Sequence, residues 1–328
     1  MYQILKEAGL PDGVIQFIPG DPKMITEETF GHTEFAGLHF TGSTDIFKSL
    51  WKKASENLDI YKSFPRIVGE TGGKNMHMIH ESADIHNAAL QTIRSSFEYN
   101  GQKCSACSRV YVPRSRFAEF RQILIAEHAK IKQGPVDSTM RLILDFENHM
   151  TAVINKASFD KITGYIKQVK TGENSSTEIL AGGGSNDKVG YFIEPTILVT
   201  SDPHSSTMTD ELFGPVVTIF VYDGSFEEAL NLADSSTKYA LTCAIFAQDR
   251  QALIFASDKL RNAAGNMYFN DKCTGAVVGQ QPFGGARMSG TNDKAGSYLN
   301  LLRWVSPRTI KESFLPIKSF SYPSNVQN

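Results

Sequence analysis

The sequence predicts an α/β fold built around a mainly parallel sheet. Short apolar runs rich in β-branched residues alternate with longer segments of helical period, and this alternation is typical of successive β-α-β units. At 328 residues the chain exceeds the usual size of one domain, so two domains with separate cores are expected. No internal repeat or low-complexity tract interrupts the pattern.

The expected strands are apolar runs of strand length, bounded by turn residues. In chain order they are Val14–Ile18, Gly37–Thr41, Arg66–Val68, Met76–Ile79, Arg109–Val112, Val216–Tyr222, Ala240–Phe246 and Gly265–Phe269. The expected helices have apolar residues at helical spacing between these runs. The clearest are Thr44–Asn57, Ile85–Tyr99, Arg114–Ile131, Thr151–Lys170, Phe226–Asp234 and Arg250–Leu260.

The N-terminal segment has an unusual order of elements. The stretch L-K-E-A-G-L-P-D-G-V-I-Q-F-I-P-G, from Leu5 to Gly20, reads as the end of a helix, a turn and a strand. No strand precedes that helix, so the α/β layer opens partway through a crossover connection. We therefore expect the N-terminal part of the first domain to be absent from this chain.

Composition limits the class of partner. Hydrophobic residues make up 41% of the chain, charged residues 21%, and the formal net charge is only -2. This balance shows neither the basic footprint of a nucleic-acid-binding protein nor an acidic tail. No run approaches the roughly 18 apolar residues of a membrane span. We therefore expect a small-molecule substrate, with no nucleic acid and no membrane as partner.

Cysteine usage and the N-terminus indicate the compartment. The four cysteines, Cys104, Cys107, Cys243 and Cys273, are too few for a disulfide framework in a chain this long, which favours a reducing compartment. The start, M-Y-Q-I-L-K-E-A-G-L, lacks the basic and apolar regions of a signal peptide and the Arg- and Ser-rich pattern of a transit peptide.

The stretch F-T-G-S-T-D, Phe40 to Asp45, places a hydroxyl residue where a strand gives way to an amphipathic helix. Free backbone N–H groups and the helix dipole make such a helix start an anion site, to which Ser43 can add a hydroxyl donor. Ser43 or Thr44 can equally serve only as the helix cap, and without further context the cap is the favoured interpretation.

The stretch V-G-E-T-G-G-K-N, Val68 to Asn75, sets Glu70 directly after an apolar strand and before paired glycines. Open α/β sheets build their sites at the carboxyl ends of strands. Partial burial there would raise the pKa of Glu70 toward the range of a general base. A loop carboxylate paired with Lys74 is the alternative, and the two interpretations are evenly balanced.

The stretch E-Y-N-G-Q-K-C-S-A-C-S-R leaves three interpretations of Cys104: a reactive thiolate, half of a C-x-x-C pair with Cys107, or a buried sulfur. Small neighbours leave room for a substrate, and Lys103 with nearby N–H groups can lower the pKa of a thiol. A metal pair is disfavoured because no second C-x-x-C or His cluster is evident, and no metal is expected. A redox C-x-x-C pair would stand at the start of a helix, near the beginning of a compact domain. Cys104 and Cys107 are not placed in this way.

Two further stretches have the composition of ligand-binding loops. In D-E-L-F-G-P-V, Glu211 can accept hydrogen bonds from sugar hydroxyls and Phe213 can pack against a ring, although an ordinary acidic turn reads the same way. The glycine-dense run from Asn270 to Lys294 can form an anion-binding nest of backbone N–H groups. So long a loop in a compact protein is usually functional.

Taken in chain order, these stretches resemble the aldehyde dehydrogenase superfamily. They are F-T-G-S, G-E-T-G-G-K-N, G-Q-K-C-S-A-C-S-R, E-L-F-G-P-V and T-G-A-V-V-G-Q-Q-P-F-G-G-A-R-M-S-G-T-N-D-K. Within the superfamily the likeness is greatest to the enzymes of proline catabolism that oxidise L-glutamate γ-semialdehyde, the open form of 1-pyrroline-5-carboxylate, to L-glutamate. Another aldehyde specificity and a non-catalytic remnant remain as alternatives.

The resemblance implies a role for each residue singled out above. Cys104 would be the nucleophile, Glu70 the base that activates water, and NAD the oxidant. Cofactor contacts would come from Ser43, Glu211 and Phe213. Substrate contacts would come from Ser105, Gly275, Ala276 and Phe283.

The resemblance also implies the domain organisation. Residues 1–81 would form the C-terminal part of a Rossmann-like NAD-binding domain, residues 82–285 an α/β catalytic domain, and residues 286–328 a return to the cofactor domain that ends in an oligomerisation strand, Ser313–Pro323. The expected assembly is a homodimer or higher homo-oligomer. The expected location is the mitochondrial matrix, with the cytoplasm as the alternative.

Overall fold

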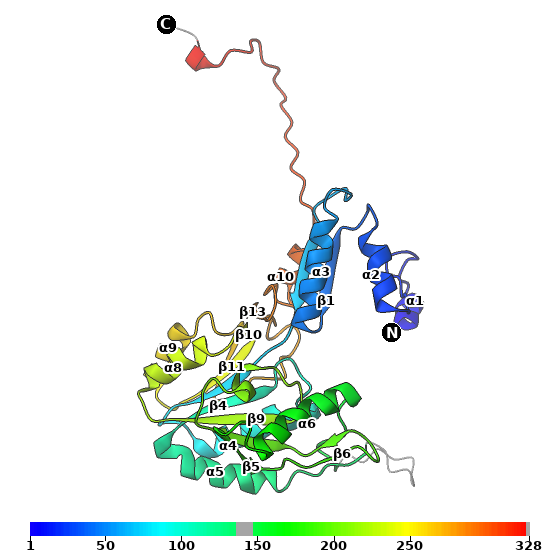
Figure 1. Cartoon of the computed structure of the whole chain (residues 1–328). Helices are drawn as coiled ribbons and strands as arrows, with labels where there is room; N and C mark the ends of the chain where they lie inside the picture. Colours follow the sequence, from blue (N-terminus) through cyan, green and yellow to red (C-terminus); the bar gives the residue numbers. More distant parts are fainter. Residues whose placement is uncertain (136–146, 326–328) are drawn as a thin grey trace.

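A seven-stranded, predominantly parallel sheet is the centre of the computed structural model, which describes residues 1–135 and 147–325 (Figure 1). Every neighbouring pair of its strands is parallel except the edge pair β5 and β8, which is antiparallel. From one edge to the other the strands are β12 (Asn266–Phe269), β11 (Thr242–Phe246), β3 (Asn75–Ile79), β4 (Cys107–Pro113), β9 (Val216–Tyr222), β8 (Thr196–Thr200) and β5 (Thr177–Ala181). The predicted α/β fold class is therefore confirmed.

Helices cover both faces of this sheet, and each face has its own core. Helices α8 (Phe226–Ser235) and α9 (Arg250–Lys259) cover one face, and α4 (Ile85–Phe97) and α5 (Arg114–His128) cover the other. Successive side chains of β3 point to opposite faces. Met76 and Met78 pack against α8 and α9, while His77 and Ile79 face α4 and α5. Because both faces are buried, the central strands read as continuous apolar runs.

A smaller part of the fold contains the parallel pair β1 (Gly37–Thr41) and β2 (Arg66–Glu70), connected by α3 (Thr44–Glu56). Phe47 on α3 lies against β2 at Gly69, where an added Cβ would come within 2.2 Å of the Phe47 ring. A glycine is needed there for the helix to pack this closely on the strand. The packing places the start of α3 and the end of β2 side by side.

The remaining elements are short or peripheral. The other helices are α1 (Tyr2–Glu7), α2 (Pro22–Phe30), α6 (Lys156–Lys170), α7 (Ser206–Thr209), α10 (Tyr298–Leu302) and the 3₁₀ turns Glu98–Gly101 and Pro323–Asn325. Two small antiparallel sheets pair β6 (Ser185–Asn186) with β7 (Phe192–Ile193), and β10 (Tyr239–Ala240) with β13 (Ala286–Arg287). Within the described ranges, no helix combines the length and apolarity needed to cross a membrane.

One predicted strand was wrong, and several elements were missed. Val14–Ile18 has no regular structure, and its apolar side chains are exposed. In the described part of the chain no strand lies beside it to pair with its backbone, so its β-branched composition is not sufficient to form a strand. The missed elements are α2, β5 and β8, together with the short α7, α10, β6, β7 and β13. The other predicted helices and strands are present, with boundaries shifted by a few residues.

Two features bear on the predicted domain division. The change from the small sheet to the seven-stranded sheet falls between β2 and β3, before the predicted boundary at residue 81. The segment Ser313–Pro323 forms no strand in this single chain and extends away from the body, with Phe314 and Phe320 fully exposed to solvent (Figure 1). The division into domains stays a prediction.

Candidate active site

All the residues predicted from the sequence to form the site line a single cavity of about 860 Å³. They are Ser43, Glu70, Cys104, Ser105, Glu211, Phe213, Gly275, Ala276 and Phe283. Cys104 and Glu70, which are well separated in the sequence, therefore face the same space. Their individual roles stay predictions, but the geometry satisfies the condition that they share one cavity.

The cavity lies where several segments end. Ser43 is the N-cap of α3, and Glu70 is the last residue of β2, so both lie at the carboxyl end of the small parallel sheet. The Ser43 hydroxyl accepts a hydrogen bond from the Ile46 amide at 3.4 Å, so it caps the helix and also lines the cavity. Carboxyl ends of parallel strands are the usual position of α/β active sites.

The loop that carries Cys104 is held by one buried amide. The Asn75 side chain donates to the backbone oxygens of Cys104 and Ala106 at 2.7 and 2.9 Å, and accepts from the Thr242 amide at 3.0 Å. Asn75 is the first residue of β3, and Thr242 is the first residue of β11. This side chain therefore ties the nucleophile loop to two central strands. Asn75 was not among the residues predicted to form the site.

Replacing Asn75 by alanine should destabilise the fold and disorder the Cys104 loop. The change leaves two carbonyl groups and one N–H without their partner in a site that is only 2% exposed. Such losses cost about 1–3 kcal/mol for each buried group, so we expect unfolding free energy to fall by about 3 kcal/mol or more. Denaturant unfolding measures this. The control is Asn231→Ala on the exposed face of α8; equal destabilisation by both changes would contradict the argument.

The chain before Cys104 turns sharply. Tyr99 and Asn100 both have left-handed backbone conformations, with φ of 56° and 58°, and Gly101 follows with φ of 64°. The Asn100 side chain stabilises the turn by donating to Thr151 Oγ1 and Ala152 O and accepting from the Thr151 amide. The helix predicted to end at Tyr99 is thus followed by a strained connection, of the kind concentrated at functional sites.

The Cys104 thiol is reachable but not activated in this arrangement. It is half-buried, whereas Cys107, Cys243 and Cys273 are buried, and all four are free thiols. Burial and the nearby carboxylates of Glu70 and Glu211 raise the pKa of Cys104 to about 11, against the lowering effect of the Ser105 and Cys104 amides. The expectation that Lys103 lowers this pKa was wrong, because the Lys103 ammonium is paired with Glu98 at 2.8 Å.

Glu70 has the properties of a base held ready for use. Burial raises its pKa to about 7, although the nearby Gly285 amide and the Lys294 ammonium act in the opposite direction. Neither carboxylate oxygen has a hydrogen-bond partner of normal geometry among the described residues. The predicted alternative, a pair with Lys74, is not formed: Lys74 is itself buried and makes no ion pair with Glu70 in the described structure. An unpaired buried carboxylate with a pKa near 7 is suited to accept a proton from water.

Glu211 and Phe213 form another part of the cavity wall. Glu211 Oε1 accepts a hydrogen bond from the Gly73 amide at 2.8 Å, and burial raises the pKa of Glu211. A Cβ at Gly72 would come within 2.4 Å of Glu211 Oε2, so the paired glycines permit this close approach. Phe213 has a left-handed φ of 58°, and the residue is 41% exposed. A strained backbone with an exposed aromatic ring in a cavity is more consistent with ligand contact than with core packing.

The loop that contains Gly275 and Ala276 closes the other end. Gly275 has a φ of +85°, and neither the Gly275 nor the Ala276 N–H donates to another group within residues 1–135 and 147–325. The Ser105 hydroxyl is hydrogen-bonded to Thr274 Oγ1 at 2.6 Å, which connects this loop to the nucleophile loop. Two unused backbone N–H groups beside a hydroxyl pair can hold an anionic group.

A second connection between these loops passes through one carboxylate. Glu98 pairs with both Lys103, at 2.8 Å, and Lys272, at 3.0 Å. Thr274 and Glu98 were not predicted as residues of the site. The adjacency of Thr274 to Gly275 was a usable signal, but nothing local to Glu98 indicates its pairing with a lysine so distant in the sequence.

The C-x-x-C spacing does not bring its two cysteines to one site. Cys104 faces the cavity, while Cys107 is 1% exposed and lies in the core on the α4 side of the large sheet. A Cys104–Cys107 redox or metal pair is therefore not formed in the structure. Of the three interpretations of Cys104, the reactive thiol is the one consistent with its position.

Comparisons with known proteins agree with this geometry. Residues 1–310 match the Aldehyde dehydrogenase family. The chain is 52% identical over 326 residues to delta-1-pyrroline-5-carboxylate dehydrogenase, mitochondrial, of Dictyostelium discoideum, covering 98% of this chain and 57% of that protein. It is 54% identical to the delta-1-pyrroline-5-carboxylate dehydrogenase of Agaricus bisporus, covering 99% of this chain and 58% of that protein.

A solved structure is also similar. The delta-pyrroline-5-carboxylate dehydrogenase of Mycobacterium tuberculosis bound with NAD superposes with a TM-score of 0.87 at 43% sequence identity, covering 99% of this chain and 58% of that one. The chain thus spans about 57% of the length of the curated relatives that it matches. The family and the fold follow from these matches.

Proposed function

The chain belongs to the aldehyde dehydrogenase family, and on that premise we propose that it carries the catalytic centre for oxidation of L-glutamate γ-semialdehyde to L-glutamate with NAD. The observation that carries the proposal is the single cavity that contains a half-buried thiol, an unpaired carboxylate and two unused backbone N–H groups. Such a constellation supplies a nucleophile, a base and an anchor for a carboxylate. The relatives named above are called delta-1-pyrroline-5-carboxylate dehydrogenases, which supports this substrate class.

The residues present fit NAD as cofactor. The first turn of α3, capped by Ser43, offers backbone N–H groups to a phosphate. Glu211 has one oxygen, Oε2, beyond the bond to Gly73 that can accept from a ribose hydroxyl, and the exposed Phe213 ring can pack against the nicotinamide end. When bound, NAD supplies the hydride acceptor of the oxidation.

The first chemical task of the chain is covalent capture of the aldehyde. The Cys104 sulfur attacks the aldehyde carbon, and the carbonyl oxygen becomes the oxyanion of a thiohemiacetal. The backbone N–H of Cys104 donates to no other residue within the described ranges, so it is available to this oxygen. The Cys104 thiol, with a pKa near 11, releases its proton to solvent in this step, and a positive charge brought close to the sulfur would assist that loss.

Once the thiohemiacetal carbon has lost its hydride, which NAD would accept when bound, the acyl group remains on Cys104 as a thioester. The second task is hydrolysis of this thioester. Glu70 removes a proton from water, and the hydroxide adds to the thioester carbon. The C–S bond then breaks, which releases the carboxylic acid and restores Cys104. The carboxylate must be ionised to act, so turnover should decrease as pH falls through about 7, the pKa of Glu70.

Substrate kinetics test the proposed specificity. We expect kcat/KM for L-glutamate γ-semialdehyde to exceed that for butanal about 100-fold or more. Butanal has no carboxylate, so it leaves the N–H groups of Gly275 and Ala276 unpaired. Ala276→Pro removes one of these N–H groups and should raise KM for the semialdehyde without affecting butanal. Ala276→Ser keeps the N–H and is the matched control. If butanal proves the better substrate, the chain has another aldehyde specificity.

We also propose a homodimer located in the mitochondrial matrix. The exposed apolar side chains of Phe314, Leu315, Ile317 and Phe320 lie within one extended segment, which is suited to pair with a second copy. The matrix location follows the relatives whose names include the word mitochondrial. Light scattering at micromolar concentration should give twice the monomer mass, and replacing Phe314 and Phe320 by serine should give the monomer mass. A monomer from the unmodified chain would contradict the dimer.

A further inference from the structure

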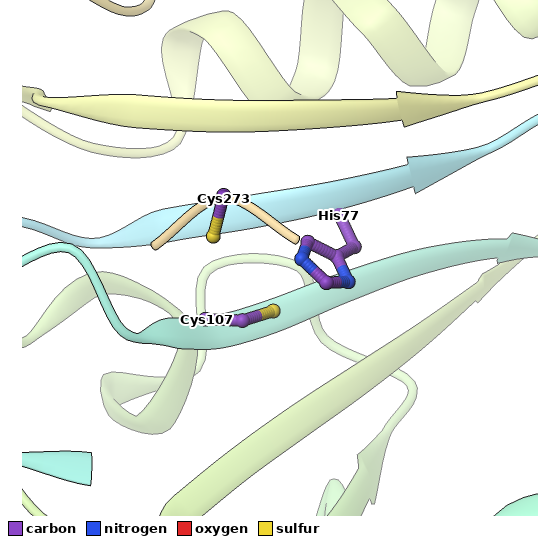
Figure 2. A group of neighbouring side chains, drawn as sticks. All are labelled: His77, Cys107 and Cys273. Atoms are coloured by element: carbon purple, nitrogen blue, oxygen red, sulfur yellow. The ribbon is translucent and has the colours of Figure 1, made fainter. Parts of the chain in front are cut away.

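A buried group of two cysteines and one histidine lies outside the cavity, on the α4 side of the large sheet. His77 comes from β3, Cys107 from the start of β4, and Cys273 from the loop after β12 (Figure 2). One potential ligand atom of each residue lies within 4.8 Å of the other two. The residues are 0%, 1% and 0% exposed, so bulk solvent does not reach them.

The hydrogen bonds of His77 leave one ring nitrogen free to bind a cation. Thr92 Oγ1 donates its only proton to Ala88 O at 2.8 Å, so it must accept from His77 Nδ1, which lies 2.9 Å away. A neutral His77 therefore carries its proton on Nδ1, and Nε2 keeps its lone pair. Nε2 is buried without a hydrogen-bond partner in the described structure, and in Figure 2 the ring turns toward the two sulfurs.

Both sulfurs belong to free thiols, so neither is held in a disulfide. The Ser95 hydroxyl lies 3.4 Å from Cys273 Sγ. The Cys107 thiol lies 3.5 Å from Arg109 O. Both sulfurs are therefore available to a cation.

We propose that His77, Cys107 and Cys273 form a binding site for a thiophilic d¹⁰ cation. Zn²⁺ is the ion whose charge matches that of the ligands. Two thiolates and one neutral imidazole neutralise a divalent ion, which matters because a net charge is costly in a fully buried site. Zinc takes cysteine sulfur at about 2.3 Å and histidine nitrogen at about 2.0–2.1 Å, so the ligand atoms must move together by about 1 Å at most. Binding releases the thiol protons to solvent.

The orientation of His77 matches that of a metal ligand. A ligating imidazole is typically held by a hydrogen bond from its other ring nitrogen, which is the part that Thr92 plays here. The expectation of no metal rested on Cys104 and Cys107, the pair adjacent in sequence. The fold instead gives Cys107 two partners that lie far away in the sequence.

The site is separate from the reacting groups but is connected to them. Cys104 is not part of the cluster. The Cys273 thiol donates to Ser105 O at 3.4 Å, and Cys273 directly precedes Thr274, the hydroxyl partner of Ser105. A bound ion would therefore stabilise the loop that contains Cys104 and the loop that contains Gly275 and Ala276, without taking part in the reaction.

Zinc titration of the reduced full chain tests the proposal. The protein is freed of metal with a chelator, incubated with Zn²⁺ long enough for entry into a buried site, and titrated in competition with a chromophoric chelator. We expect one equivalent with submicromolar affinity. Substitution by Co²⁺ should give thiolate-to-cobalt charge-transfer absorption. Cys273→Ser and His77→Gln should each weaken binding at least about 100-fold.

Matched variants separate this site from other thiols. Cys104→Ser tests the cavity thiol, and Cys243→Ser tests a buried cysteine on the other face of the sheet; both should bind zinc as the unmodified chain does. The proposal is overturned if the unmodified chain binds no zinc at micromolar concentration, an outcome that does not depend on whether any variant folds. It is also overturned if Cys104→Ser abolishes binding.

Discussion

Replacement of Cys104 by alanine is expected to abolish aldehyde oxidation, with a loss on the order of 10⁶-fold, the size seen when a covalent nucleophile is removed. No other thiol can substitute, because among the described cysteines the other three are buried away from the cavity. NADH formation from L-glutamate γ-semialdehyde measures the rate. Mass spectrometry of the unmodified protein should locate the acyl adduct on Cys104.

The control for this change is Cys243→Ala, which alters a fully buried thiol in the core against α8 and α9. That variant should keep its rate per folded molecule while losing some stability, because it leaves only a small cavity. Thiol labelling gives an independent check: Cys104 should react before Cys107, which is 1% exposed. If Cys104→Ala retains a hundredth of the original rate, Cys104 is not the nucleophile.

Replacement of Glu70 by glutamine should lower steady-state turnover by about 10²–10⁴-fold, the usual contribution of a general base. Glutamine has the same shape but cannot accept a proton from water. Capture of the aldehyde does not need this base, so a single burst of NADH should persist while the thioester accumulates on Cys104. Quenched-flow kinetics and intact mass spectrometry distinguish the two steps.

The same change should make Cys104 more reactive to iodoacetamide at pH 8. Glu70, with a pKa of about 7, is ionised at that pH, and its charge raises the pKa of Cys104. Removing the charge stabilises the thiolate. The decline in turnover below pH 7 seen with the unmodified chain should disappear in Glu70→Gln. The control is Glu98→Gln, which changes a carboxylate paired with two lysines; if it reproduces the split between burst and turnover, the assignment of the base is wrong.

Much of the fold was predictable because helices bury both faces of the large sheet. Strands β3, β4 and β11 read as apolar runs for this reason, and their positions were found. Strand β8, T-I-L-V-T, carries the same signal and was overlooked, while the edge strand β5, T-E-I-L-A, is only partly apolar. Val14–Ile18 has the residue types of a strand but does not form one, because a strand also needs a neighbouring strand to pair with.

The site was predictable where its chemistry is local to a motif. Cys104, Glu70 and the paired glycines stand in short stretches, and all the residues chosen from such stretches line the cavity. Asn75 and Glu98 were not found, because their importance comes from bonds to residues that the sequence does not place near them. The same is true of the cluster of His77, Cys107 and Cys273.

The sequence by itself determined which reactive groups the chain contains, their order, and the alternation of strands and helices, because these depend on residue type and local spacing. Only the tertiary structure decided what surrounds each group. It gave Cys104 a pKa of about 11 by placing the thiol in a buried site near two carboxylates, and it gave Glu70 a pKa of about 7 by withdrawing it from water. Burial and the distance between residues remote in the sequence are consequences of packing, and packing sets the electrostatic energy of every ionisable group in the site.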